Sequence, residues 1–201
     1  METAQHVFKS VEPVFNKHKM SEHIECEVRL GRFVGKRFDA NVGETTWKAI
    51  VSALEKYQGW ESCVTTASEV YYQGDLRMVV DGETDEQELF RKKRISNTEL
   101  KLDGRPLDAR FSVSTEEPVD PETLGENDEW EQCRCRKRRS FVRKNLRIDC
   151  TVVSGGDVDP DAEDDTEYQV EMEIIDPTKV GDKDTAFNIF YKLQDILDTI
   201  K

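Results

Sequence analysis

Two short acidic segments near opposite ends of the chain carry glutamate pairs at a spacing that could bind cations. The segments are residues 23–30, with Glu25 and Glu27, and residues 167–174, with Glu171 and Glu173. Both alternate polar and apolar residues, so in a β-strand the two carboxylates of each pair lie on one face, about 7 Å apart. At that distance they repel by roughly 2.4 kcal/mol at the effective dielectric of a protein site. If the glutamate pairs lie on a solvent-exposed face, the pattern has little meaning. If they face an interior, their charge must be balanced by a hard metal ion or by arginines.

The distribution of charge favours an enclosed polyanion site. The 201-residue chain has 42 acidic and 29 basic residues, a net charge of −13. Such a charge argues against a protein that coats nucleic acid or a membrane surface. The basic residues nevertheless gather in residues 91–94 and 134–147, and the second run contains no acidic residue. If both runs face a common interior, an acidic shell surrounds a basic hollow.

The cysteines and histidines do not predict a metal or disulfide framework. The five cysteines lack the paired spacing of a zinc site, and Cys26 and Cys150 lie in strand-like runs as expected for small core residues. The three histidines all precede residue 24, which argues against a histidine metal site. No signal peptide or membrane-length apolar run is visible, so we expect a reducing compartment and no membrane partner.

Hydrophobic periodicity predicts one mainly β (α+β) domain over residues 1–201, with helices at its ends. Helices are expected from near Ser10, where Pro13 would fall in the first turn, over residues 47–58, and from about residue 184. The strand-like runs between them are residues 69–80, 88–95, 97–102, 109–116, 131–144 and 145–153. Regular antiparallel strands predict a closed barrel or a sandwich, with residues 118–127 as an exposed hairpin loop.

Several of these strands carry charge on alternate positions. Arginines concentrate on the middle strands, for example Arg134, Arg136 and Arg138, whereas acids concentrate on the first and last. Taken singly, each pattern is typical of the wet face of an antiparallel sheet. Taken together they indicate a site for a metal-bound polyphosphate, because arginine makes bidentate phosphate contacts and carboxylates suit magnesium or manganese.

The acidic segments resemble the first and last motifs of the triphosphate tunnel metalloenzymes. Residues 24–31 are similar to the first motif and residues 170–174 to the last. The similarity is greatest to the metal-dependent RNA 5′-triphosphatases of mRNA capping found in fungi, protozoa and large DNA viruses. The other matching segments, in family order, are residues 75–77, 110–116, 134–141 and 147–153. Most of the chain is therefore covered.

This resemblance implies a closed antiparallel β-barrel of about eight strands with flanking helices and a lumen that holds one small ligand. It implies metal-dependent removal of the RNA 5′ γ-phosphate, the first step of cap formation, with Mg²⁺ or Mn²⁺ bound by Glu25, Glu27 and Glu173. The groups expected in catalysis are Glu116, which orients water, Glu171 and Arg136. The expected substrate-binding residues are Arg77, Lys93, Arg110, Arg134, Arg138 and Asp149. Arg91 and Lys93 share a face, so the register of that strand stays open.

Two positions depart from the family pattern. Gln169 stands where some members carry a third glutamate. Arg29 stands where the wider family has lysine, which argues against the cyclase and thiamine-triphosphatase branches.

Two other functions stay open. One is hydrolysis of inorganic or small-molecule triphosphates in the same fold. The other is a non-catalytic RNA-binding barrel, which would need aromatic stacking platforms, whereas only Phe141 interrupts the long basic run. The expected partners are 5′-triphosphate RNA, with free NTP or tripolyphosphate as alternatives, and an RNA guanylyltransferase. The expected location is the nucleus, or a cytoplasmic factory for a viral protein.

Overall fold

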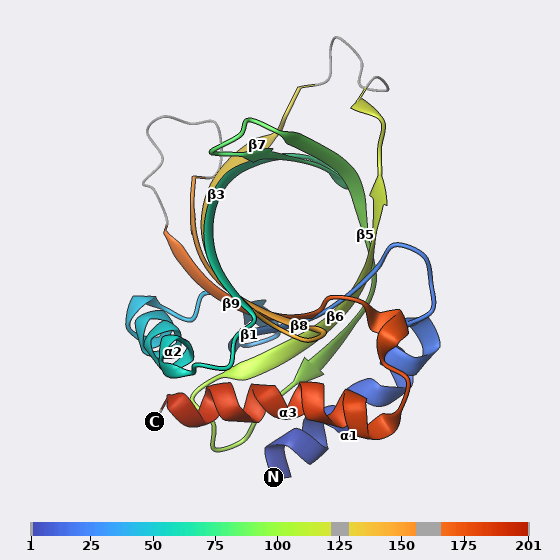
Figure 1. The fold of residues 1–201 in the computed structure, drawn as a ribbon, viewed down its shortest axis with the longest axis vertical. Helices are drawn as coiled ribbons and strands as arrows, with labels where there is room; N and C mark the ends of the chain where they lie inside the picture. The colour runs from blue at the N-terminus through green and yellow to red at the C-terminus, as the bar shows by residue number, and fades with distance from the viewer. Residues whose placement is uncertain (1, 122–128, 156–165, 201) are drawn as a thin grey trace.

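Eight antiparallel strands close into a barrel, as the sequence predicts (Figure 1). The computed structural model describes residues 2–121, 129–155 and 166–200. Around the barrel the strands follow the order β1, β6, β5, β4, β3, β7, β8 and β9, and β9 pairs with β1 to close the ring. The strands are β1 Ile24–Val34, β2 Arg37–Asp39, β3 Ser62–Gln73, β4 Leu76–Asp81, β5 Gln87–Leu100, β6 Asp108–Pro118, β7 Gln132–Arg143, β8 Leu146–Ser154 and β9 Glu167–Ile174. The short β2 forms a hairpin with β1 and stays outside the ring.

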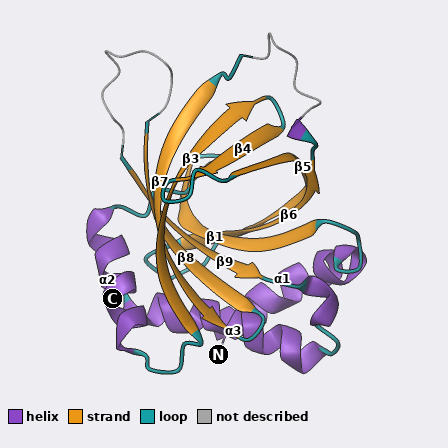
Figure 2. Ribbon diagram, turned by 45° about the horizontal axis from the view of Figure 1, so that its top comes forward, coloured by secondary structure: helices purple, strands orange, loops and turns teal. Residues whose placement is uncertain are grey.

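The helices of the described chain lie along one side of the barrel (Figure 2). They are α1 Glu2–His18, α2 Glu44–Lys56 and α3 Lys183–Thr199, with a 3₁₀ turn, η2, at Pro177–Lys179. In α2 the apolar residues recur at helical spacing, which buries Ile50, Val51 and Leu54. No helix among the described residues is long and apolar enough to cross a membrane.

The hydrophobic core lies outside the barrel, between its wall and the helices. Cys26, Val28 and Leu30 of β1 belong to this core, together with Phe111 of β6 and Phe190 of α3, whose ring centroids are 5.7 Å apart. Cys26 and Cys150 are buried and free, which confirms their prediction as core residues. Because side chains alternate between the faces of a strand, the polar side chains between these residues point into the lumen.

Two strand boundaries differ from the predicted ones. Residues 69–80 do not form one strand but the end of β3 and most of β4, since Gly74 adopts a φ of 55° and turns the chain. Residues 88–100 form one strand, β5, instead of two, with a bulge between Arg94 and Ser96. A bulge reverses which alternate positions face the lumen, and this has consequences for the site.

The first helix is longer than predicted. It begins at Glu2 and contains Pro13 in its interior, where a proline costs a backbone hydrogen bond. Pro13 and Lys9, whose carbonyl loses its partner, are both exposed, so water can replace the missing donor. The predicted loop at residues 118–127 and the acidic run before β9 lie partly outside the described residues.

Candidate active site in the barrel lumen

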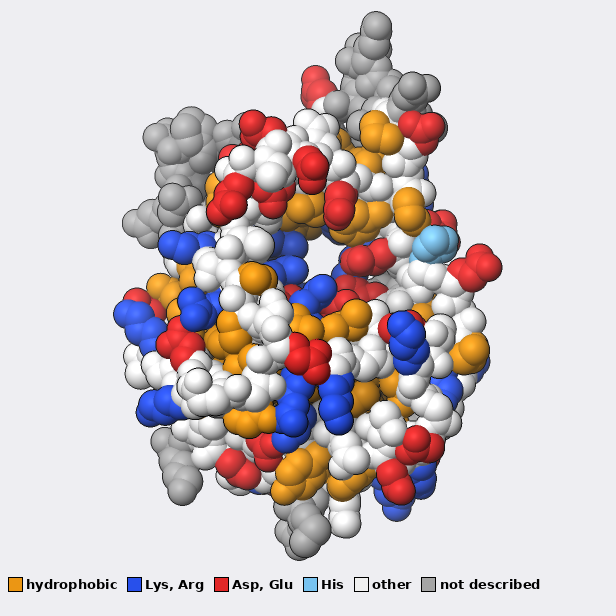
Figure 3. Space-filling view, viewed as in Figure 1, with side chains coloured by type: hydrophobic (Ala, Val, Ile, Leu, Met, Phe, Trp, Pro, Cys, Tyr) orange, Lys and Arg blue, Asp and Glu red, His pale blue; other side chains and the backbone are white. Residues whose placement is uncertain are grey.

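The strand register brings all but one of the predicted site residues to the lumen. Glu27 lies opposite Ser112 of β6 and Glu173 of β9, and Glu173 in turn lies opposite Arg147 of β8. The predicted residues on the lumen face are Glu25, Glu27, Arg77, Arg110, Glu116, Arg134, Arg136, Arg138, Asp149, Glu171 and Glu173. Part of the lumen is a cavity of about 360 Å³ whose lining is mostly polar. Figure 3 shows an opening with basic side chains on one side and acidic ones on the other.

Lys93 is the residue that the structure does not bring into the lumen. It pairs with Thr115 and is exposed on the outer face of β5. Its neighbour Lys92 faces the lumen, with Nζ 2.5 Å from Glu25 and 2.9 Å from Glu116. Burial alone would lower the pKa of Lys92, but Glu25, Glu27 and Glu116 raise it, so the side chain stays charged. Lys92 therefore takes the place in the site that the sequence assigned to Lys93.

Three carboxylates, of Glu25, Glu27 and Glu173, form an acidic wall on β1 and β9. Burial raises the pKa of Glu27 to about 7, against the opposing effect of Arg29, and Glu171 and Glu25 add to the rise. Burial likewise raises the pKa of Glu173 to about 7, opposed by its ion pair with Arg147 and assisted by Glu25. Glu25 accepts hydrogen bonds from Ser114 at 2.7 Å and is bound by Lys92. Burial therefore makes the charged forms of Glu27 and Glu173 costly even though each contacts a basic side chain.

The chemistry of these donors fits a hard divalent cation. Carboxylate oxygens are the ligands that magnesium and manganese prefer, and burial makes the charged forms of Glu27 and Glu173 costly, a cost that a bound cation would offset. As the side chains are placed, no three acidic, histidine or cysteine groups among the described residues converge on one point. Each carboxylate is instead turned towards a basic side chain: Lys92, Arg29 or Arg147. Metal binding would require them to rotate away from these partners.

Glu171 differs from the three carboxylates of the acidic wall. Its Oε1 lies 2.6 Å from Nη2 of Arg29. Burial alone would raise its pKa, but Arg29, Arg138 and Arg136 outweigh that effect and lower it. Glu171 is therefore a fixed anion that holds Arg29 in place. Environments that separate the pKa values of neighbouring carboxyl groups in this way assign them different roles.

A basic wall, made of arginines from β4, β6 and β7, faces the cavity. Among the described residues, Arg29, Arg110 and Arg134 each have a buried Nε–H without a hydrogen-bond partner. A buried N–H that lacks a partner costs free energy, and an anion that approached these three donors would offset that cost. Phosphate oxygens match the donor geometry of guanidinium groups.

Asp149 orients two arginines at the β7–β8 side of the lumen. It is buried, and its Oδ2 lies 3.3 Å from Nη1 of Arg138 and 3.1 Å from Nε of Arg147. Ser140 donates a hydrogen bond of 2.6 Å to its Oδ1. Asp149 therefore contributes to the site as a support for arginines, which a bound phosphate would need in fixed positions.

Tyr72 is a lumen residue that the sequence did not single out. The Arg77 guanidinium lies 4.5 Å from the centre of its ring, and the Arg136 guanidinium lies 6.0 Å away and donates a hydrogen bond to its hydroxyl. Burial and then Arg136 lower the pKa of Arg77, although Tyr72 partly opposes them. One aromatic ring thus contacts two like-charged side chains. No sequence signal pointed to it, because the contact depends on the unexpected turn at Gly74.

Comparison with known proteins finds a capping-enzyme family model and solved structures of similar fold. The family model described as mRNA capping enzyme, beta chain, matches residues 48–192. The fold is similar to S. pombe Pct1 RNA triphosphatase, with a TM-score of 0.76 and 18% identity over 96% of this chain and 90% of that one. The structure of S. pombe Pct1 RNA triphosphatase in complex with the Spt5 CTD has a TM-score of 0.76 and 16% identity, over 96% of this chain and 92% of that one. The Mimivirus capping enzyme triphosphatase has a TM-score of 0.64 and 14% identity, over 96% of this chain and 97% of that one. No curated protein matches significantly.

Proposed function

The chain belongs to the mRNA capping enzyme, beta chain, family, and we propose that its lumen is the place where the 5′ γ-phosphate of RNA is removed. The protein is an mRNA 5′-triphosphatase, a hydrolase that acts on 5′-triphosphate RNA. The observation that supports the lumen as its active site is a cavity of about 360 Å³ that is lined by Glu27 of the acidic wall and, facing it, by the arginines Arg77, Arg110, Arg134 and Arg136. A polyphosphate chelated by a cation needs both kinds of wall at once.

The family is metal-dependent in general, and we propose Glu25, Glu27 and Glu173 as the ligands of Mg²⁺ or Mn²⁺ here. When bound, the ion supplies positive charge that polarises the terminal phosphate. The three carboxylates hold that charge on one wall of the barrel, and Glu171 stays engaged with Arg29. Lys92, which now contacts Glu25, then becomes free to face the phosphate chain.

The basic wall binds the phosphates and stabilises the charge of the transferring group. Arg134, Arg136 and Arg77 line the cavity, and Arg138 is held beside them by Asp149. Arg110 lines the cavity from β6, with its guanidinium over the ring of Phe38. Phosphoryl transfer needs positioning and charge stabilisation more than covalent chemistry, so fixed arginines suit the reaction.

Glu116 is the group that we assign to orienting the attacking water. It lies on the lumen face of β6 and its Oε1 is 2.9 Å from Nζ of Lys92. Its side chain is less enclosed than those of Glu27 and Glu171, with 34% exposed, so water can reach it. A carboxylate that accepts a hydrogen bond from water directs one oxygen lone pair towards phosphorus.

The metal dependence of phosphate release tests this function. Release of inorganic phosphate from a 5′-triphosphate RNA is measured with no added metal, with Mg²⁺ and with Mn²⁺, for the wild type and for Glu27→Ala. We expect release only with metal and only in the wild type. A non-catalytic RNA-binding barrel would bind the RNA under all conditions and release nothing.

The enclosed lumen also supports activity on free NTP or tripolyphosphate, because its charged walls contact the phosphates. We expect tripolyphosphate to compete with 5′-triphosphate RNA, whereas 5′-hydroxyl RNA of the same sequence does not. Equal competition by the hydroxyl RNA would contradict an enclosed triphosphate site.

We further propose that the product passes to an RNA guanylyltransferase. A 5′-diphosphate end is the group to which a guanylyl unit is added, so the two enzymes act in succession. Capping follows transcription, and we propose the nucleus, or a cytoplasmic factory for a viral protein, as the location. If the tagged chain were found outside both the nucleus and a viral factory, this part of the proposal would be contradicted.

A further inference from the structure

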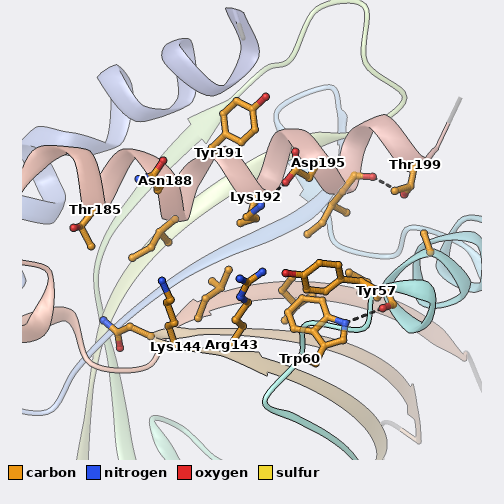
Figure 4. A pocket seen from close by; sticks show the side chains of 17 residues that line it. Tyr57, Trp60, Arg143, Lys144, Thr185, Asn188, Tyr191, Lys192, Asp195 and Thr199 are labelled. Atoms are coloured by element: carbon orange, nitrogen blue, oxygen red, sulfur yellow. Dashed lines mark hydrogen bonds and ion pairs between the residues drawn. The ribbon is translucent and has the colours of Figure 1, made fainter.

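A second cavity, which we call the outer groove, lies on the outside of the barrel wall. It has a volume of about 600 Å³ and is bounded by α2, α3 and the hairpin between β7 and β8. Figure 4 shows α3 along one side, and Arg143, Lys144 and Trp60 on the other. Among the described residues, none that lines this groove also lines the lumen cavity. The outer groove is therefore separate from the site of phosphate removal.

The floor of the outer groove is apolar and contains two fixed aromatic rings. Tyr57 and Trp60 meet edge to face with centroids 5.3 Å apart, and Trp60 also packs on Phe141 at 5.5 Å. The indole Nε1 of Trp60 donates a hydrogen bond of 2.7 Å to the carbonyl of Leu54, which fixes the ring. Tyr57 is 42% exposed, so its ring can be contacted from solvent. A preformed apolar cavity of this size accommodates one or two bulky side chains.

The rim of the outer groove is basic on an otherwise acidic molecule. Arg143 places its guanidinium 5.2 Å from the centre of the Tyr57 ring, and Lys144 follows it in the hairpin turn. Neither forms an ion pair with another described residue, whereas Lys192 on α3 binds Asp195 at 2.7 Å. The Glu61 carboxylate accepts a hydrogen bond of 3.1 Å from the backbone N–H of Lys144. The lining itself has three basic side chains and one acidic one, so the groove has an excess of positive charge in a chain of net charge −13. That excess attracts anionic groups and repels basic ones.

We propose that the outer groove docks an acidic segment of a partner protein. The segment places one bulky apolar side chain against Tyr57 and Trp60, and its carboxylate or phosphate groups lie beside Arg143 and Lys144. A second copy of this chain fits less well, because two molecules of charge −13 repel each other. RNA fits less well because the floor between α3 and the barrel is lined by aliphatic residues such as Leu146, Ile189 and Ile196, which suit an apolar side chain.

Fluorescence anisotropy with labelled peptides tests the proposal on the full chain. The probes are twelve-residue peptides of Asp and Glu with one central Trp or Leu, the same peptides with phosphoserine in place of two acids, and versions with Ala at the centre. We expect saturable binding that weakens roughly tenfold or more when the anchor becomes Ala and when the protein carries Arg143→Gln with Lys144→Gly. Lys144 has a φ of 52°, which glycine adopts readily, so the hairpin should keep its fold.

Lys137→Gln is the matched control, since it removes a positive charge from the exposed outer face of β7, away from the groove. All variants should hydrolyse tripolyphosphate normally, because none of these residues lines the lumen. If the wild type bound the peptides but hydrolysed no triphosphate, that result would contradict the proposed function and leave the docking proposal intact. The docking proposal fails if no probe binds below about millimolar concentration, or if Lys137→Gln weakens binding as much as the groove variant. Displacement of the peptide by 5′-hydroxyl RNA would assign the groove to RNA. A dimer in sedimentation that the groove variant dissociates would assign it to a second copy.

Discussion

Glu27 and Glu173 lie directly opposite each other across the pairing of β1 with β9, the pairing that closes the barrel. Like charges at opposed positions destabilise a sheet, and burial adds to the effect. The pKa of each group is raised to about 7, although Arg29 and Arg147 contact them. Two buried carboxyl groups thus face each other where β1 pairs with β9, which is electrostatically unfavourable when both are charged. An unfavourable pair of this kind is expected at functional sites, which is consistent with the proposal that Glu27 and Glu173 bind a cation.

We predict that the metal-free protein loses stability between pH 5 and pH 8, and that Glu173→Gln reduces this loss. A carboxyl group whose pKa is higher in the folded than in the unfolded chain adds stability below its ordinary pKa, and that stability is lost as the pH rises through about 7. Glutamine cannot ionise, so between pH 5 and pH 8 the unfolding free energy of Glu173→Gln should fall by about 1 to 3 kcal/mol less than that of the wild type. Urea unfolding across this pH range measures it, with Glu22→Gln, an exposed carboxyl group, as control. Parallel profiles for wild type and Glu173→Gln would contradict the prediction.

We predict that Mg²⁺ or Mn²⁺ raises the melting temperature of the wild type at pH 8. A ligand that binds only the folded state at a hundred times its Kd adds about 2.7 kcal/mol of stability. Glu25→Ala, Glu27→Ala and Glu173→Ala should each remove most of this gain and abolish hydrolysis while the protein stays folded. Differential scanning fluorimetry measures the shift, with NaCl at the same ionic strength as the control for screening. A variant with normal turnover in saturating Mg²⁺ would show that its residue is not a ligand.

The sequence predicted the barrel and most of its lumen because the apolar core lies outside the ring. Packing against α1 and α3 requires Phe111 and Val113 to face outwards, which sends Arg110 and Ser112 inwards. Strict alternation in a strand therefore identifies its lumen face without any knowledge of the partner strands.

The same alternation could not place Lys92 and Lys93. The bulge between Arg94 and Ser96 shifts the register within β5, and its position depends on pairing with β6, which the sequence of β5 alone does not contain. The contacts of Lys92 with Glu25 and Glu116 join three strands, so they follow from the closed barrel only. For the same reason, the sequence could not predict which basic side chain pairs with which carboxylate in the lumen.

We predict that Glu116→Gln lowers kcat by roughly two or more orders of magnitude with little change in metal affinity, because an amide cannot attract the proton of the attacking water. Steady-state kinetics over a metal titration measures both quantities. Lys92→Met and the double variant form a cycle that tests the alternative, in which Glu116 only holds Lys92 at 2.9 Å. In that case Lys92→Met would lose as much as Glu116→Gln, and the double variant no more. If Glu116→Gln kept a normal kcat at saturating metal but needed a much higher metal concentration to reach it, Glu116 would be a metal ligand. Glu171 would then have to position the water.

We predict that Tyr72 positions Arg77 and Arg136 for phosphate binding. Its ring lies 4.5 Å from one guanidinium and 6.0 Å from the other, so it keeps two repelling cations close together. Tyr72→Phe keeps the ring and should raise the KM for 5′-triphosphate RNA only a few-fold. Tyr72→Leu removes the ring and should raise KM by about tenfold or more, because a cation–π contact contributes about 0.5 to 2 kcal/mol. Kinetics with both variants measures the difference.

Tyr71→Leu is the control for Tyr72, since the neighbouring tyrosine faces the other side of β3 and packs against Trp130 with centroids 6.0 Å apart. It should leave KM unchanged while costing a similar amount of aromatic packing. If Tyr71→Leu raised KM as much as Tyr72→Leu, the effect would come from a weakened β3 and not from the arginines. Addition of salt separates the two cases further. Binding through correctly placed arginines weakens as salt screens the phosphate charge, so Tyr72→Leu should show a shallower dependence of KM on salt than the wild type. A purely structural loss would leave that dependence unchanged.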